Sequence, residues 1–501
     1  MFSLKKLPAI PQDRQPFVYL ALAGILEFLF ITMVSIPSYV GYYLAETYLI
    51  VPCLLFLGYV LREKQTGFAR RRLLLAVVAV IWFVISQTLH KLNGMENQVI
   101  TNVFAVYLLA FPFAALTDDR EDTGIRWFSK FLVAATLVLV MYTVILMLDM
   151  VPADWREFLY WDGTRLTVFW HPNITACYLM MGIGFCIALL IQTRKPLMKV
   201  LLAAAVATQF LVMALTNCRT TLLMTGALLG GVVFFCIFRG SWKQFVLGLL
   251  AAALVLVGSF KFSGVIYQWN EDRIYANISA LQELSEDQNG VITEEDTEPE
   301  IDQYDVVEDG QVAITTQELS EDQNIATTEG DTEPEIDQYD VVEDDQVVIT
   351  TDNYQESFAH DMRTLNGRTN IWQSALLAIQ ENNSLAWYGT EYIGTVISVY
   401  NFFPVEHSHN SWMEVLMRTG VPGLLITLVF TGICVVSAVK LLLKRETELW
   451  KKAIAMTTMC VMVAGFLEPY LFGGKAYYHA IDFAFFLCTG YLDYWCHQKK
   501  T

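Results

Sequence analysis

Residues 174–192, ITACYLMMGIGFCIALLIQ, form an uncharged apolar stretch, and about 20 such residues are enough to cross a lipid bilayer as one α-helix. Eleven further apolar runs of similar length flank this stretch along the chain, near residues 17–36, 43–61, 73–89, 98–116, 128–148, 199–216, 219–238, 244–260, 412–439, 453–471 and 477–495. The pattern predicts an all-α integral membrane protein with about 12 transmembrane helices.

Composition and charge agree with a membrane protein once one insert is set apart. Of 501 residues, 54% are hydrophobic, and the mean hydropathy is +0.41, values that soluble chains of this length rarely reach. Two consecutive 35-residue blocks, 282–316 and 317–351, each carry 12 Asp and Glu and no Lys or Arg. Without those 24 acids, 27 acids remain against 33 bases, so the rest of the chain carries +6 although the whole carries −18.

Basic residues are distributed unequally between the predicted connections. With a cytoplasmic N-terminus, the inner segments hold 23 of the 33 Lys and Arg, as the positive-inside rule expects. The first apolar run, 17–36, lacks a small-residue cleavage pattern, so we expect a retained helix. The sequence therefore predicts a multi-pass protein of the cytoplasmic (inner or plasma) membrane with both termini in the cytoplasm.

The predicted helices divide the chain into three regions. Residues 1–260 hold helices 1–9, residues 261–410 form a large extracytoplasmic loop, and residues 411–501 hold helices 10–12. Within the loop, the two acidic blocks are identical at 29 of 35 positions, and their high net charge with low hydrophobicity predicts disorder. Near 368–386 the periodicity predicts an amphipathic helix, whose apolar face would carry Ile371, Trp372, Ala375, Leu376 and Ile379.

Nine cysteines are scattered through the chain, none of them in the large loop and none in a C-x-x-C pair. They suit small apolar helix residues, so the sequence predicts neither a disulfide framework nor a metal site. The acidic blocks also lack the D-x-D-x-D-G spacing of a calcium loop. We expect no metal and no cofactor.

The tenth predicted helix opens with Glu406-His-Ser-His-Asn-Ser-Trp-Met-Glu414. Ser411 and Glu414 have the spacing of a capping box, which places the helix N-terminus just after His409 and Asn410. The N–H groups and positive dipole end there favour an anion at the outer membrane border. The same field disfavours imidazolium, so we expect a neutral His409 that can accept a proton. An ordinary interfacial helix cap explains the same residues without any catalytic role.

Arg418 lies two turns inside the same helix, where a charge requires a partner. Glu27 and Glu468 are the intramembrane acids able to pair with it, and the sequence does not choose between them. Glu468 is also an alternative to His409 as a base. Farther along, Gly420 and Gly423 are small residues suited to close helix contact.

Four motifs resemble those of one known family. His409-Asn410, nine residues, and Gly420-Val-Pro-Gly423 are similar to the H-[NSQ]-x9-G-x-x-G signature of O-antigen ligases. Three other segments resemble elements of that family in the same order: Gly163-Thr-Arg165 through Trp170-His-Pro-Asn173, Asn217-Cys-Arg219-Thr220 and Gly367-Arg368-Thr-Asn-Ile-Trp372. The resemblance is to the O-antigen ligase and Wzy-type polymerase superfamily. Cys218 and His171 stand where this family usually has Ser and Asn, and the acidic repeat has no counterpart in the family pattern.

The resemblance implies a metal-independent glycosyltransferase of GT-C-like architecture. Such an enzyme moves a glycan from undecaprenyl diphosphate to a glycan or lipid-linked acceptor on the outer side of the membrane, and it binds no nucleic acid. This is the chemistry of O-antigen, capsule and exopolysaccharide synthesis. Polymerases and ligases share the motifs, and of the two we favour the polymerase.

Carried onto matching positions, the resemblance implies roles for individual residues. His409 would assist activation of the acceptor hydroxyl, a poor nucleophile that benefits from a general base, and Glu414 is the second catalytic candidate. Arginine pairs with phosphate oxygens through two parallel hydrogen bonds, which suits a diphosphate. By the resemblance, Arg219 and Arg368 would bind the diphosphate. Arg165, Asn410 and Trp372 are further candidates for substrate binding, and an aromatic anchor at the membrane interface explains Trp372 without that role.

Two other classes of function compete with this interpretation. A polysaccharide or lipid transporter (a flippase) predicts two similar halves or paired broken helices, and the sequence has neither. A helical scaffold for an acidic sensor loop is the third possibility, and it would lose its function if the repeat were deleted.

Overall fold

The computed structural model describes residues 13–34, 49–93, 95, 101–147, 160–162, 165–167, 172–238, 240–289, 366–401, 405, 407–472 and 479–498. They divide into two units, Met1–Asp287 with Ile371–Thr501, and Gln288–Asn370. Of the predicted disordered repeat, 290–351 lies outside the described residues, whereas 282–289 is helical.

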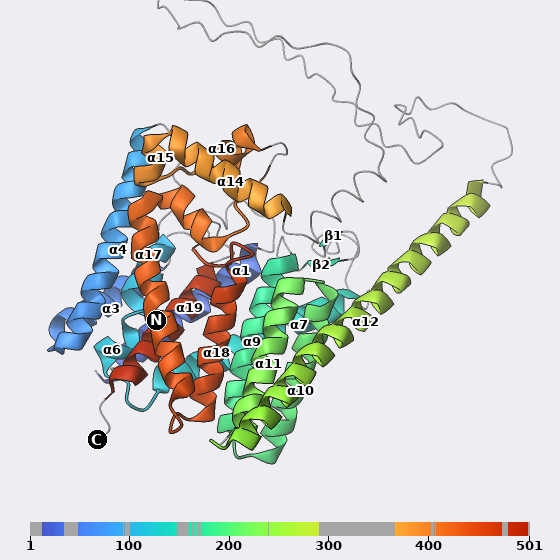
Figure 1. The fold of residues 1–501 in the computed structure, drawn as a ribbon, viewed down its shortest axis with the longest axis horizontal. Helices are drawn as coiled ribbons and strands as arrows, with labels where there is room; N and C mark the ends of the chain where they lie inside the picture. Colours follow the sequence, from blue (N-terminus) through green and yellow to red (C-terminus); the bar gives the residue numbers. More distant parts are fainter. Residues whose placement is uncertain are drawn as a thin grey trace, which may run out of the picture. The chain divides into compact units, whose positions relative to one another are not determined.

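The described residues are almost entirely helical (Figure 1). The longer helices of the N-terminal part are α1 (Gln15–Val34), α3 (Ile50–Arg62), α4 (Gly67–Leu92), α7 (Thr123–Met147), α9 (Pro172–Gln192), α10 (Pro196–Leu215), α11 (Arg219–Ile237) and α12 (Trp242–Asn289). The C-terminal part forms α14 (Asn366–Glu381), α15 (Asn383–Tyr388), α16 (Ile393–Tyr400), α17 (Ser411–Leu443), α18 (Leu449–Ala464) and α19 (His479–His497). Strands β1 (Tyr160–Asp162) and β2 (Arg165–Thr167) pair antiparallel as one short hairpin.

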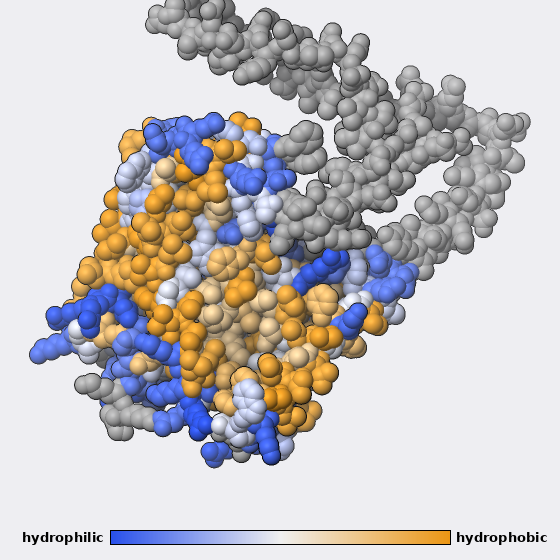
Figure 2. Space-filling view, in the orientation of Figure 1, coloured by the Kyte–Doolittle hydropathy of each residue, from blue (hydrophilic) through white to orange (hydrophobic). Residues whose placement is uncertain are grey.

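Seven of the described helices are long and apolar enough to cross a membrane: α4, α7, α9, α10, α11, α12 and α17. Figure 2 shows apolar side chains covering α4 and α17 on the visible face, with hydrophilic residues gathered toward the ends of these helices. Exposed apolar side chains such as Ile81 and Leu425 are suited to lipid. The prediction of a multi-pass, helical membrane protein is therefore confirmed.

Helix α9 lies at the centre of the bundle, which explains why its sequence lacks charge. It packs against α7, α10, α11 and α18, and 83% of its membrane window is buried. Gly184 allows close approach of Thr457 on α18, where any larger side chain would collide. By contrast, only 6% of the membrane window of α12 is buried, so its apolar side chains face the surroundings.

Two predicted helices have different bounds in the structure. The apolar run 98–116 is divided into α5 (Thr101–Phe104), the π-helical η1 (Ala105–Ala110) and α6 (Phe113–Thr117). Pro112 separates the last two, because proline lacks the N–H that a continuous helix requires. Helix α12 does not end near 260 but runs to Asn289, into the region predicted as loop.

Helix α17 is kinked at Gly420, the first glycine of the G-x-x-G motif. Gly420 has φ 70°, and a Cβ at this position would collide with the backbone of Trp387 in α15. The N–H of Thr390 donates to the carbonyl of Met417 at 2.7 Å, and the Trp82 indole of α4 donates to the carbonyl of Thr419 at 3.0 Å. The carbonyls of Met417 and Thr419, next to the kink, therefore accept hydrogen bonds from outside the helix.

The predicted amphipathic helix near 368–386 corresponds to two helices. Asn382 separates α14 from α15, because its side-chain oxygen accepts the N–H of Ser384 and so starts a new helix. Ile371 and Ala375 are buried in a small cluster with Met417 of α17. This contact fixes part of α14 beside the beginning of α17.

Candidate active site at the start of α17

Asn410 sets the beginning of α17. Its Oδ1 accepts the N–H groups of Trp412 and Met413 at 2.9 and 3.0 Å, and its Nδ2 donates to the carbonyl of Phe466 at 3.0 Å. The predicted helix start is therefore right, but the capping box is wrong. Ser411 is already the first helical residue, and its hydroxyl instead donates to the carbonyl of Glu468 at 3.0 Å.

His409 immediately precedes this cap. Its Nδ1 lies 3.7 Å from Oε2 of Glu468, and its side chain is 31% exposed whereas that of Glu468 is 4% exposed. The ring of His407 packs edge-on against that of His409, with centroids 4.2 Å apart. The imidazole thus has a buried carboxylate behind Nδ1 and an exposed side toward the surroundings.

Glu414 holds the segment that carries His409. Its Oε2 accepts the backbone N–H and the hydroxyl of Ser408 at 3.2 and 2.9 Å. The indole of Trp372, on α14, donates to the carbonyl of Ser408 at 2.9 Å. The sequence predicts a catalytic role for Glu414 and substrate binding for Trp372. In the structure both side chains contact Ser408, the residue before His409.

Arg418 is buried and pairs with two carboxylates, Glu391 at 2.6 Å and Glu414 at 3.3 Å. The partners predicted for it, Glu27 and Glu468, are both wrong. Glu391 lies in the connection between α15 and α16, and the kink at Gly420 brings this connection against α17. A buried arginine is tolerated here because two acids share its charge.

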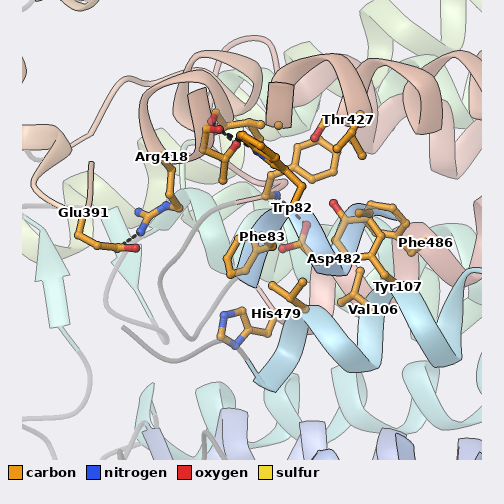
Figure 3. A pocket seen from close by; sticks show the side chains of 17 residues that line it. Trp82, Phe83, Val106, Tyr107, Glu391, Arg418, Thr427, His479, Asp482 and Phe486 are labelled. Atoms are coloured by element: carbon orange, nitrogen blue, oxygen red, sulfur yellow. Dashed lines mark hydrogen bonds and ion pairs between the residues drawn. The ribbon is translucent and has the colours of Figure 1, made fainter. Parts of the chain in front are cut away.

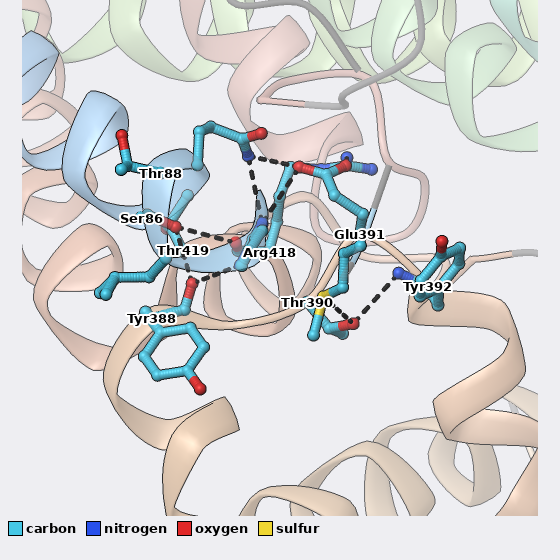
Figure 4. A network of polar contacts seen from close by, with 12 residues as sticks. Ser86, Thr88, Tyr388, Thr390, Glu391, Tyr392, Arg418 and Thr419 are labelled. Atoms are coloured by element: carbon cyan, nitrogen blue, oxygen red, sulfur yellow. Dashed lines mark hydrogen bonds and ion pairs between the residues drawn. The ribbon is translucent and has the colours of Figure 1, made fainter. Parts of the chain in front are cut away.

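Glu391 is the centre of a polar network that joins α4 to α17 (Figure 4). Gln87 of α4 donates to its carboxylate, and His90 Nδ1 lies 3.3 Å from it. Burial acts to raise the pKa of Glu391, but the hydrogen bond from His90, the charge of Arg418 and the hydrogen bond from Gln87 lower it, and the net effect is a lowered pKa. The carboxylate form of Glu391 is therefore favoured, and its contacts link α4 to α17.

Arg219 is the first residue of α11, and its side chain is exposed. The preceding Cys218 lies with Sγ 3.3 Å from the hydroxyl of Tyr470. Tyr470 belongs to the 465–472 segment that follows α18, and the same segment carries Glu468. The structure therefore brings the start of α11 and the start of α17 to one connecting segment.

Three residues beside this segment have left-handed backbone conformations: Asn217 (φ 47°), His409 (φ 51°) and Phe472 (φ 61°). Such values are uncommon for residues other than glycine, and they gather where the surrounding structure holds a functional site. They occur at the start of α11, before α17 and at the end of the 465–472 segment.

The other candidates lie elsewhere on the chain. Arg165 is the first residue of β2, and its side chain is outside the described residues. Arg368 lies in the first turn of α14 and is partly buried, in the stretch that belongs to the second unit. Within the described part of the chain, no group of three or more His, Cys, Asp or Glu is arranged to hold a metal ion.

Sequence reasoning missed Glu391, Ser408 and Tyr470. Their contacts join residues that are distant in the chain, such as Glu391 with Arg418 and Tyr470 with Cys218. No local spacing in the sequence predicts such contacts.

Helices with membrane-spanning character and a histidine–carboxylate pair define a multi-pass membrane protein with a candidate catalytic centre. Residues 204–428 match the family described as O-antigen ligase, and this match supports an O-antigen ligase or Wzy-type family. No curated protein matches the chain. The match favours a glycosyltransferase-type enzyme over a transporter, and this family acts on lipid-linked oligosaccharide and glycan acceptors in the membrane.

Proposed function

We propose that the protein polymerises undecaprenyl-diphosphate-linked oligosaccharide at the outer face of the cytoplasmic membrane, without a metal ion. The hydroxyl oxygen of the acceptor sugar attacks the anomeric carbon of the donor, and the bond from that carbon to the diphosphate breaks. Undecaprenyl diphosphate leaves, and the hydroxyl proton passes to a base on the protein. The family match supports the reaction class. The assignment as a polymerase and not a ligase is part of the proposal.

The pair formed by His409 and Glu468 is the observation that carries this proposal. A carboxylate at Nδ1 favours the tautomer that leaves Nε2 free to accept a proton. The 3.7 Å separation is longer than a hydrogen bond, and catalytic contacts often tighten only when substrate is bound. His409 is the base in this scheme and Glu468 orients it.

Arginine side chains supply the charge that the leaving group needs. Arg219 is exposed at the first turn of α11, where helix N–H groups also face outward and favour an anion. We assign Arg219 and Arg368 to the diphosphate, with Arg165 as a further candidate. Glu414 and Trp372 are engaged with Ser408, so we assign both to positioning His409.

The same proposal includes the membrane arrangement. We propose a GT-C-like body of 12 spans with both termini in the cytoplasm, supported by the 23 of 33 bases that then lie inside. In this arrangement, His409 and the 261–410 region face outward, where the donor arrives by lateral diffusion in lipid. The acidic repeat acts as a solvated linker.

The test is an assay of the purified full-length protein in detergent with undecaprenyl-diphosphate-linked oligosaccharide. We expect a ladder of longer lipid-linked glycans, unchanged by a chelator. A single transfer onto a different acceptor lipid would indicate a ligase. Reconstituted protein that moves the lipid-linked donor across vesicles without making any new glycosidic bond would contradict the proposal.

A further inference from the structure

A cavity lies along α17 beyond His409, lined by α4, η1, α17, α19 and the 391 connection. Figure 3 shows Glu391 and Arg418 at one end, Tyr107 and Phe486 at the other, and Asp482 between them. Arg418, which lines the cavity, pairs with Glu414, and Glu414 accepts the hydroxyl of Ser408 beside His409. The cavity is therefore connected to the proposed reaction centre through Glu414.

The charges around the cavity do not suit an anion. Arg418, its only Lys or Arg among the described lining residues, already pairs with Glu391 and Glu414. Asp482 adds another carboxyl group to the wall. A diphosphate would meet more acid than base here, so this cavity differs from the diphosphate site assigned above.

A purely hydrocarbon ligand does not suit the cavity either. Arg418 is buried with 8% of its side chain exposed, and its Nε has no hydrogen-bond partner among the described residues. Asp482, whose Oδ1 accepts the N–H of Phe472 at 2.8 Å, and Thr427 also line the wall. An isoprenyl chain would offer no partner to Arg418 Nε, and keeping that buried donor unpaired costs free energy.

Aromatic rings supply the rest of the wall. Trp82, Phe83, Tyr107, Phe472 and Phe486 all line the cavity. A ligand that matches both features has apolar C–H faces for the rings and hydroxyl groups for the polar atoms. Sugar rings have both.

We propose that this cavity is a subsite for an uncharged sugar ring of the glycan substrate. Aromatic faces contact the ring, while Arg418 Nε and the Asp482 and Thr427 side chains bond to its hydroxyls. The role of this subsite in the reaction rests on the proposed function. Binding of a sugar to the cavity does not require turnover, so it can be measured separately. It predicts selection for neutral sugars over uronic acids at this position.

The test measures binding by ligand-observed NMR to the full-length protein in detergent. The probes are methyl glycosides of glucose, galactose and N-acetylglucosamine, the methyl glycoside of glucuronic acid, inorganic pyrophosphate and farnesol. At least one neutral glycoside should bind saturably below about 100 mM and more tightly than the glucuronide. Thr427→Val should weaken that binding about 2–10-fold, because one neutral hydrogen bond is lost.

Thr458→Val is the matched control, since its hydroxyl bonds within α18 and does not line the cavity. Binding should be unchanged in this variant and in His409→Ala, so loss of turnover and loss of the subsite are separable. Absence of saturable glycoside binding to the wild type would overturn the proposal. So would preferential binding of pyrophosphate or farnesol that Thr427→Val weakens, or equal weakening by the two threonine variants.

Discussion

The Nδ1 atom of His409 lies 3.7 Å from the Oε2 atom of Glu468, and these two residues belong to different elements of the bundle. His409 precedes α17, and Glu468 follows α18. Asn410 and Ser411 fasten the two elements together through the carbonyls of Phe466 and Glu468. The position of the imidazole is thus determined by tertiary contacts as well as by its helix cap.

Glu468→Gln should lower kcat about 10-fold or more while leaving KM for the lipid-linked donor nearly unchanged. The amide keeps the size of the side chain but loses the charge that favours one tautomer of His409. Steady-state kinetics on purified protein measures both constants. An equal loss in protein abundance and activity, with normal kcat per folded molecule, would assign Glu468 to folding alone.

Arg219→Lys and Arg368→Lys should each raise KM for the donor although the charge is kept, and alanine should be worse at both positions. Lysine lacks the planar fork that pairs with two phosphate oxygens. Arg120→Lys is the control, because Arg120 forms an exposed pair with Asp118. Wild-type donor affinity in both lysine variants would rule out diphosphate binding by these residues.

Glu391→Gln should destabilise the protein at pH 7 and have a smaller effect near pH 4. The pKa of Glu391 is lowered below its ordinary value of 4.5, so its ionised form contributes stability above that value. That contribution is lost as pH falls through the pKa of the folded state. Thermal unfolding in detergent at several pH values measures this, and a difference that grows on acidification would contradict the assigned network.

Gly420→Ala should cost about 1–3 kcal/mol, because φ 70° disfavours any Cβ and the new methyl would collide with the backbone of Trp387. Gly432→Ala, on the same helix, meets nothing within 4 Å and should be neutral or slightly stabilising. Unfolding curves of both variants make the comparison. Equal stability of the two would mean that the kink is not needed.

The sequence predicts what depends on neighbouring residues. The start of α17 follows from a local pattern of polar residues before an apolar run, and this pattern also puts His409 directly before the helix cap. The capping residue is Asn410 and not the predicted Ser411. The hydroxyl of Ser411 donates to the carbonyl of Glu468, and Asn410 accepts the N–H of Trp412. Nothing in the sequence around 468 indicates this.

Long-range pairing explains the other differences. Arg418 pairs with Glu391 because a kink at Gly420 admits a connection whose path no pattern specifies. The apolar run predicts a helix that ends near 260. Hydropathy indicates only where a helix leaves the lipid, and the helix itself can continue beyond that point. Helix α12 continues to Asn289 through a polar sequence.

The central claim is that His409 is the base, and the most direct measurement compares His409→Ala with His407→Ala. Both are purified in detergent and supplied with saturating undecaprenyl-diphosphate-linked oligosaccharide, and product formed per minute is measured. General-base assistance accounts for about 10²–10⁴-fold in rate, so His409→Ala should lose that much while His407→Ala loses far less. Near-normal turnover of folded His409→Ala, with Glu468→Ala or Glu414→Ala inactive, would show that the base is a carboxylate and contradict the account.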